Sequence, residues 1–133
     1  MLFRSQEGFN VIAAINEGYI GTVPLNEALK NRFIIIDVPY IEGEQLKDLI
    51  QTNTKLENNQ LINLFVKLSA DLIGAVNQGK VSEEAASIRA LLDACDLSTL
   101  IPPKRAILRA IVDKLEEERE RNLVLNIADT LFE

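Results

Sequence analysis

The chain has 133 residues, 47% of them hydrophobic and 26% charged, a composition typical of a globular domain rather than a disordered or fibrous protein. Its 20 acidic and 14 basic side chains give a formal net charge of −6, so we expect no non-specific binding to nucleic acid or to anionic lipid. The sequence contains no histidine, which excludes histidine-based catalytic triads and histidine-ligated zinc.

The single cysteine and the hydropathy pattern bear on location. Cys95 lies in the apolar run 90–97, which indicates a buried thiol in a reducing compartment and excludes an internal disulfide. Residues 1–10 have no apolar segment of signal-peptide length, and no later stretch approaches the roughly 18 apolar residues that a membrane-spanning helix needs. We therefore expect a soluble, cytoplasmic protein.

Two short apolar runs near the start of the chain predict β-strands that are covered on both faces. Residues 9–15 form the first run, and residues 33–38 form a β-branched second run that ends at Pro39. Between them, residues 26–32 predict a short helix with Asn26 at or near its N-cap. A strand, a helix and a strand within about 30 residues are typical of a parallel sheet.

The sequence after Tyr40 has helical periodicity throughout. We predict helices over residues 42–53 and 60–77, one within 82–97, one that opens at 102–103, and a last one around 123–131. The charged run 116–121 fits a solvated helix face or a helix junction better than an acidic docking site. The predicted fold is thus an α/β fragment, residues 1–40, followed by an all-α helical bundle, residues 41–133.

A sheet of two parallel strands is physically odd by itself. Without a third strand, each strand exposes unpaired backbone groups and half of its apolar surface. Two explanations stay open. The chain could associate with itself through these strands, or it could be the tail end of a longer protein.

Three segments resemble the C-terminal portion of MoxR-like and dynein-related AAA+ ATPases. Residues 9–21 are similar to the sensor 1 strand of these proteins, residues 25–33 to the arginine-finger helix, and residues 87–94 to the sensor 2 motif at the start of a lid helix. The resemblance spans nearly the whole chain. It implies the last two strands of an AAA+ parallel sheet followed by a helical lid domain.

The resemblance assigns Asn16 as sensor 1, a catalytic role. Its carboxamide would lie beyond the carboxyl end of a buried strand, where ligands bind in open α/β sheets. There it could donate to a γ-phosphate oxygen and orient the attacking water. The competing interpretation is an asparagine that caps a turn before Gly18.

The resemblance also assigns two arginines. Arg32 would be a catalytic finger that reaches the γ-phosphate of a neighbouring subunit, or it could simply bind the last carbonyls of its helix. Arg89 would bind nucleotide of its own subunit if Ser87, rather than Ser82, caps its helix. The competing interpretation of Arg89 is an i,i+4 ion pair with Asp93.

Two parts of a nucleotide site are missing from the sequence. No G-x-x-x-x-G-K-[ST] phosphate-binding loop occurs, and Asp37 is followed by Val38 rather than by the second acidic residue expected of a Mg²⁺ site. We therefore expect ATP and Mg²⁺ only in a longer protein, and neither cofactor nor ATPase activity for this chain alone. In that longer protein, the resemblance implies a homo-oligomeric ring, usually a hexamer, that remodels or activates a client protein.

A second function remains open. The chain could be a non-enzymatic helical module for protein interaction or oligomerisation, derived from a truncated ATPase. The helices between Glu42 and Phe132 would then form its interaction surface.

Overall fold

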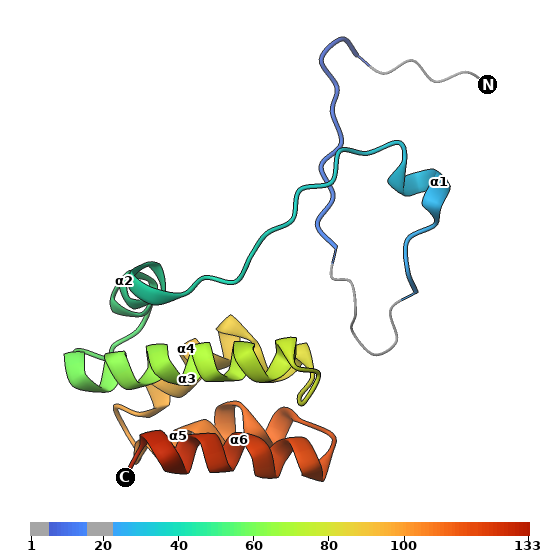
Figure 1. Cartoon of the computed structure of the whole chain (residues 1–133). Helices are drawn as coiled ribbons and strands as arrows, with labels where there is room; N and C mark the ends of the chain where they lie inside the picture. Colours follow the sequence, from blue (N-terminus) through green and yellow to red (C-terminus); the bar gives the residue numbers. More distant parts are fainter. Residues whose placement is uncertain (1–5, 16–22) are drawn as a thin grey trace.

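The computed structural model describes residues 6–15 and 23–133 of the chain. A helical bundle runs from Gly43 to the C-terminus, and an arm of extended chain precedes it. Figure 1 shows the arm, coloured blue to cyan, apart from the bundle and joined to it by the segment that enters helix α2. Within the arm, the only helix among the described residues is the short α1 (Glu27–Lys30).

The bundle contains five α-helices and two 3₁₀ turns. In chain order these are α2 (Gly43–Asn53), α3 (Asn59–Asn77), η1 (Glu83–Ala86), α4 (Ile88–Leu97), α5 (Pro103–Ala110), η2 (Val112–Lys114) and α6 (Glu118–Leu131). Helix α3 is the centre of the bundle, because it contacts α2, α4, η1 and α6, while α4 packs against α5.

Local signals in the sequence account for several helix ends. The side chain of Asn26 accepts a hydrogen bond from the backbone N of Ala28 at 2.8 Å, which confirms the predicted cap of α1. At the end of α3, Gly79 adopts φ +67°, and the backbone N of Lys80 donates to the carbonyl of Ala75 at 2.9 Å. This is the Schellman arrangement, in which glycine is favoured because its φ is positive.

The predicted helix within residues 82–97 is divided in two. Ser87 has extended backbone angles, so it ends the 3₁₀ turn η1 and caps α4, where its hydroxyl accepts a hydrogen bond from the backbone N of Ala90 at 3.4 Å. Ser82 stands at the N-cap position of η1, but its side chain makes no capping hydrogen bond there. Ser87 is therefore the serine whose side chain caps a helix.

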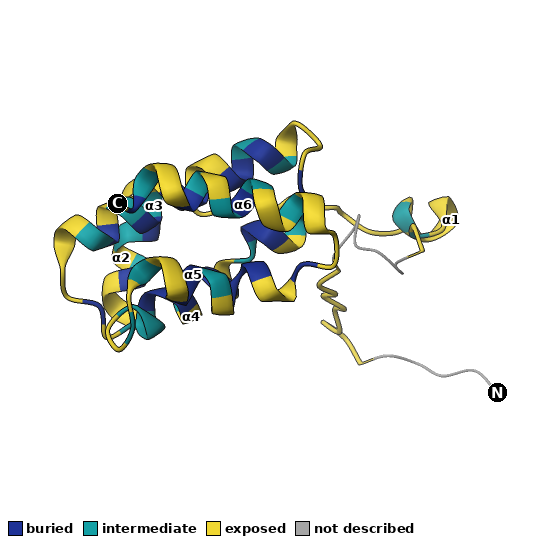
Figure 2. Cartoon of the chain, turned by 90° about the horizontal axis from the view of Figure 1, so that it is seen from below, coloured by how far each residue is buried: buried dark blue, intermediate teal, exposed yellow. Residues whose placement is uncertain are grey.

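The bundle closes its own hydrophobic core. Phe65 of α3 is fully buried and lies against Phe132 at the C-terminus, with ring centroids 5.1 Å apart. Figure 2 shows the buried residues, in dark blue, on the faces of the helices that point inward, and the arm almost entirely in yellow. Packing of this kind is what makes helices with one apolar stripe stable.

The predicted fold class is wrong for the structure of this chain. We expected two strands of a parallel sheet, at residues 9–15 and 33–38, but the described residues contain no strand. The physical reason is that a strand depends on hydrogen bonds from a neighbouring strand, whereas a helix satisfies its own backbone. The described chain is all-helical, with two extended apolar segments before the bundle.

Candidate interaction surface

The arm carries most of the large apolar side chains that the described chain exposes. We use the name apolar arm for residues 9–15 and 33–41. Its exposed large apolar residues are Phe9, Val11, Ile12, Ile15, Phe33, Ile34, Ile35, Ile36, Val38, Tyr40 and Ile41. In contrast, the fully described bundle exposes only Ile88 and Leu100 among residues of this kind. An apolar surface of this extent exceeds the ordinary scatter of apolar surface residues, which makes the apolar arm the candidate interaction surface.

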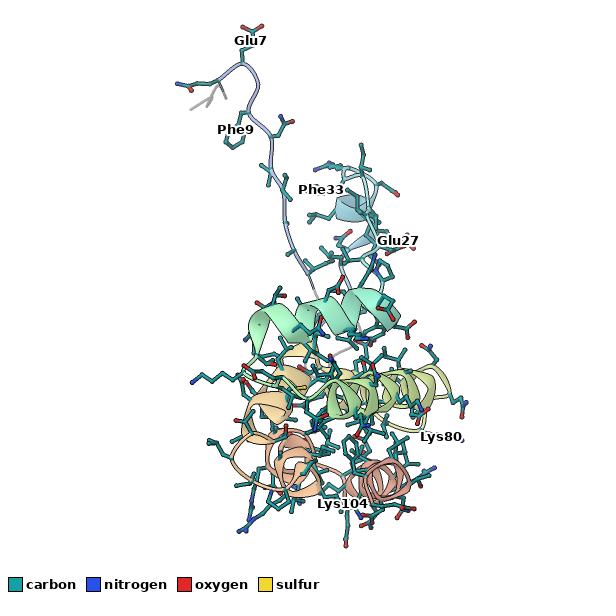
Figure 3. All side chains as sticks on the ribbon, turned by 90° about the vertical axis from the view of Figure 1, so that its left-hand side faces the viewer. Glu7, Phe9, Glu27, Phe33, Lys80 and Lys104 are labelled. Carbon is teal, nitrogen blue, oxygen red and sulfur yellow. The ribbon has the colours of Figure 1, made fainter. Side chains whose placement is uncertain are left out.

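The second half of the apolar arm contains three side chains that are almost completely exposed. The side chains of Ile34, Ile36 and Val38 are 92%, 81% and 88% exposed. In an extended chain, alternate side chains share a face, so these three form one apolar face, while Phe33 and Ile35 share the opposite face. Figure 3 shows Phe9 and Phe33 among the side chains of the arm, at a distance from the bundle residues Lys80 and Lys104.

The backbone of residues 34–38 is unpaired within the described part of the chain. The local hydrogen bonds that follow α1 end at Phe33, whose backbone N donates to the carbonyl of Lys30 at 3.3 Å. From residue 34 to residue 38, no backbone group is hydrogen-bonded to another described residue. The segment therefore offers both apolar side chains and free backbone donors and acceptors.

Of the three predicted nucleotide-binding residues, Asn16 lies outside the described residues. Arg32 follows α1 in the arm and is exposed, and Arg89 is exposed in the first turn of α4 in the bundle. Figures 1 and 2 both show α1 apart from α4. The structure thus does not bring the two arginines together, and the roles assigned to all three residues stay predictions.

The structure does not show the alternative ion pair of Arg89 with Asp93. The carboxylate of Asp93 pairs with Lys114 at 3.3 Å, and both side chains are about half exposed. A surface pair of this kind contributes about 0 to 1 kcal/mol. Arg89 remains an exposed cation at the start of a helix.

Neither a metal site nor a reactive cysteine is found among the described residues. No group of three or more cysteine or acidic side chains is placed to hold a metal ion within the described part of the chain. Burial, and to a smaller extent the negative charge of Asp96, raises the pKa of the Cys95 thiol to about 12. This confirms Cys95 as a buried thiol, and it keeps the sulfur protonated and unreactive at neutral pH.

A shallow groove between α3 and α6 has a volume of about 310 Å³. Ala70 and Gly74 line it from α3, and Leu123 and Ile127 line it from α6, with Asp71 and Lys80 at its polar side. Among the described residues, no buried side-chain nitrogen or oxygen lacks a hydrogen-bond partner, so the groove presents no unpaired buried side chain to a ligand. The groove is therefore a weaker candidate than the apolar arm.

Two long-range contacts in the bundle were not predicted from the sequence. Glu120 of α6 accepts hydrogen bonds from Ser82, and Asp96 of α4 accepts one from the backbone N of Lys55 at 2.7 Å. Their partners lie 38 and 41 positions apart in the chain. Since no periodicity links positions so distant, the sequence carries no signal that could have found these contacts.

No protein family matches this chain. No solved structure matches it either. Within the part of the chain that the structure describes, no helix is long and apolar enough to cross a membrane.

Curated bacterial proteins are similar to the chain over nearly its whole length. The uncharacterized protein YojN of Bacillus subtilis (strain 168) is 63% identical over 132 residues, which cover 99% of this chain and 43% of YojN. An uncharacterized protein of Staphylococcus epidermidis (strain ATCC 12228) is 55% identical over 131 residues, which cover 98% of this chain and 50% of that protein. The chain thus spans about half the length of these relatives.

These comparisons correct the predicted relationship. The relatives have no AAA+ or MoxR name, and the described residues lack the sheet that such a fragment would contribute. The interpretation as the C-terminal portion of a MoxR-like AAA+ ATPase, which would contribute the last strands of a parallel sheet, is therefore wrong. Neither the names of the relatives nor the helical fold tests ATP binding, hydrolysis or chaperone activity. The three motifs are short, and they were matched without the phosphate-binding loop that carries most of the chemistry in such a site.

Proposed function

We propose that this chain is a non-enzymatic protein-interaction module, which uses the apolar arm to dock onto polypeptide that lies outside these 133 residues. The observation that supports this proposal is that the two parts of the chain differ in how far their apolar side chains are buried. The bundle buries its own core, whereas the arm exposes residues such as Ile34 and Ile36 almost completely. The sequence predicted an interaction surface on the helices, and the structure favours the arm instead.

The lengths of the relatives indicate where the partner surface lies. More than half of YojN, and half of the Staphylococcus epidermidis protein, lie outside the region that matches this chain. Each relative therefore holds enough additional polypeptide for a domain that could cover the apolar arm. We take this additional polypeptide as the docking partner. A cytoplasmic location agrees with this function and with a single cysteine that is free and buried.

Full-length YojN is the protein in which to test the docking. Substitution of aspartate at the positions aligned with Ile34 and Ile36 would place two charges in a buried interface, which we expect to cost about 3 kcal/mol or more. The same two substitutions in the 133-residue chain alone should change its stability by less than about 0.5 kcal/mol, because both side chains are exposed there. The measurement is chemical unfolding followed by circular dichroism.

A matched control uses an exposed apolar residue of the bundle. Leu100 is 81% exposed, so aspartate at the aligned position of YojN should leave its stability nearly unchanged. Equal and small effects of all these substitutions in YojN would contradict the proposal. A second outcome would contradict the choice of partner. If light scattering finds that the isolated chain is a dimer and that the Ile34→Asp substitution dissociates it, the partner is a second copy of the chain.

A further inference from the structure

The segment at residues 34–38 presents more than apolar side chains. Its backbone N–H and C=O groups have no hydrogen-bond partner among the described residues. Such groups are satisfied by water while they are exposed, but they need protein partners once the segment is covered. Any surface that buries the side chains of this segment must therefore also supply donors and acceptors for its backbone.

The side chains of the segment define what kind of surface can do this. Ile34, Ile36 and Val38 occupy one face of the extended chain, and Phe33 and Ile35 occupy the other, so apolar residues lie on both faces. β-Branched residues favour the extended conformation and disfavour a helix. Six residues in this conformation span about 20 Å, which is the usual length of a strand.

We propose that residues 33–38 bind by strand addition to the exposed edge of a β-sheet, and that this sheet belongs to the polypeptide outside the matched region of the longer relatives. The inference rests on the proposed function and names how its partner recognises the arm. The sheet edge supplies the missing backbone hydrogen bonds, and elements on both sides of the sheet cover the two apolar faces.

The end of the segment fits this mode of binding. Pro39 has no backbone N–H and follows Val38 directly, so it ends the run of residues that can pair. Asp37 is the only charged residue between Phe33 and Pro39. The segment between Pro39 and α2, which begins at Gly43, is then a short connection from the added strand to the bundle.

A second copy of the chain is a poorer partner than a preformed sheet. Two copies that paired through this segment would form a ribbon of two strands, which is marginally stable in water. One face of that ribbon would still expose the isoleucines that the pairing should cover. A sheet that already has several strands and covering elements avoids both costs, and the longer relatives have the additional length to contain one.

Amide hydrogen exchange tests the inference. In the isolated 133-residue chain, the amides of residues 34–38 should exchange at nearly the rate of an unstructured peptide. In full-length YojN, the aligned amides should exchange at least 100-fold more slowly, and their ¹³Cα chemical shifts should be those of a strand. Aspartate at the position aligned with Ile36 should abolish this protection, and valine there should preserve it.

The outcomes separate this inference from the proposed function. If the aspartate substitutions destabilise YojN but the aligned amides exchange rapidly, or show helical shifts, the arm docks by another mode and strand addition is wrong. If the substitutions have no effect and the amides exchange rapidly, the proposed function is wrong as well. Protected amides in the isolated chain, together with a dimer in light scattering, would assign the added strand to a second copy.

Discussion

Glu120 and Ser82 are joined by two hydrogen bonds, although they belong to different parts of the bundle. The backbone N of Ser82 donates to Oε1 of Glu120 at 2.9 Å, and the Ser82 hydroxyl donates to Oε2 at 2.8 Å. Both side chains are partly buried. The carboxylate in the first turn of α6 thus binds the start of η1 and links these two elements.

Removal of this contact should destabilise the bundle. We expect Glu120→Ala to lower the free energy of unfolding by about 2 kcal/mol, because a hydrogen bond to a charged group contributes about 1.5 to 3 kcal/mol and the N–H of Ser82 loses its partner. Glu116→Ala is the matched control, since Glu116 is an exposed carboxylate outside the contact. Urea unfolding measures both, and equal effects would show that the contact adds nothing.

Two glycines of the bundle should respond to alanine in opposite directions. Gly74 lies within α3, and a Cβ there would meet no atom within 4 Å, so Gly74→Ala should raise the stability by about 0.5 to 1 kcal/mol. Gly79 adopts φ +67° at the end of the same helix, so Gly79→Ala should lower the stability by about 1 kcal/mol.

Thermal unfolding of the two variants beside the unchanged chain gives the comparison. The pair is informative because both substitutions add one methyl group to a glycine of the same region. A loss of stability in the Gly74 variant would mean that the groove beside α3 and α6 is occupied or narrower than its lining residues indicate.

The helices of the bundle were predictable because their signals are local. The apolar spacing along α2 and α3 placed both helices within one residue of their observed starts, and Gly79 marked the end of α3. The division at Ser87 is also a local effect, but two serines competed as caps and the sequence alone did not choose between them.

The arm was not predictable in the same way. The runs at 9–15 and 33–38 have the residue types of strands, but a strand exists only when another segment pairs with it. No such segment is found among the described residues. The candidate surface exists because the predicted strands are not paired in a sheet, so the side chains of both apolar runs are exposed. The contact of Ser82 with Glu120 could not be predicted either, because only the tertiary structure brings these two residues together.

Cys95 should make the stability depend on pH in alkaline solution. Its pKa is about 12 in the folded chain, against an ordinary value of 9.0, because burial disfavours the thiolate and Asp96 adds to the effect. Between these values the unfolded chain loses the thiol proton and the folded chain keeps it. The contribution of Cys95 is therefore fully present below pH 9 and decreases as the pH rises toward 12.

The comparison with Cys95→Ala isolates this contribution from that of other groups. The alanine variant will be less stable at neutral pH, because it leaves a small cavity in the core. Above about pH 9, the stability of the unchanged chain should fall more steeply with pH than that of the variant. Parallel curves in urea unfolding from pH 8 to 11 would contradict the shift.

The 133-residue chain alone should not bind ATP. Its sequence has no phosphate-binding loop, and its described residues place no acidic cluster for Mg²⁺. Arg32 and Arg89 lie in the arm and in the bundle, so neither can complete a site with the other as the chain is folded here. Titration calorimetry with Mg-ATP at micromolar protein should show only heats of dilution.

The variants Arg32→Ala and Arg89→Ala give the control for this titration, and they should produce the same trace as the unchanged chain. Saturable binding with a dissociation constant in the low micromolar range would contradict the prediction. If either arginine variant then weakened that binding, the arginine would have to contact the nucleotide, and the chain would have to bring phosphate ligands together in a way that its helices and exposed arm do not show.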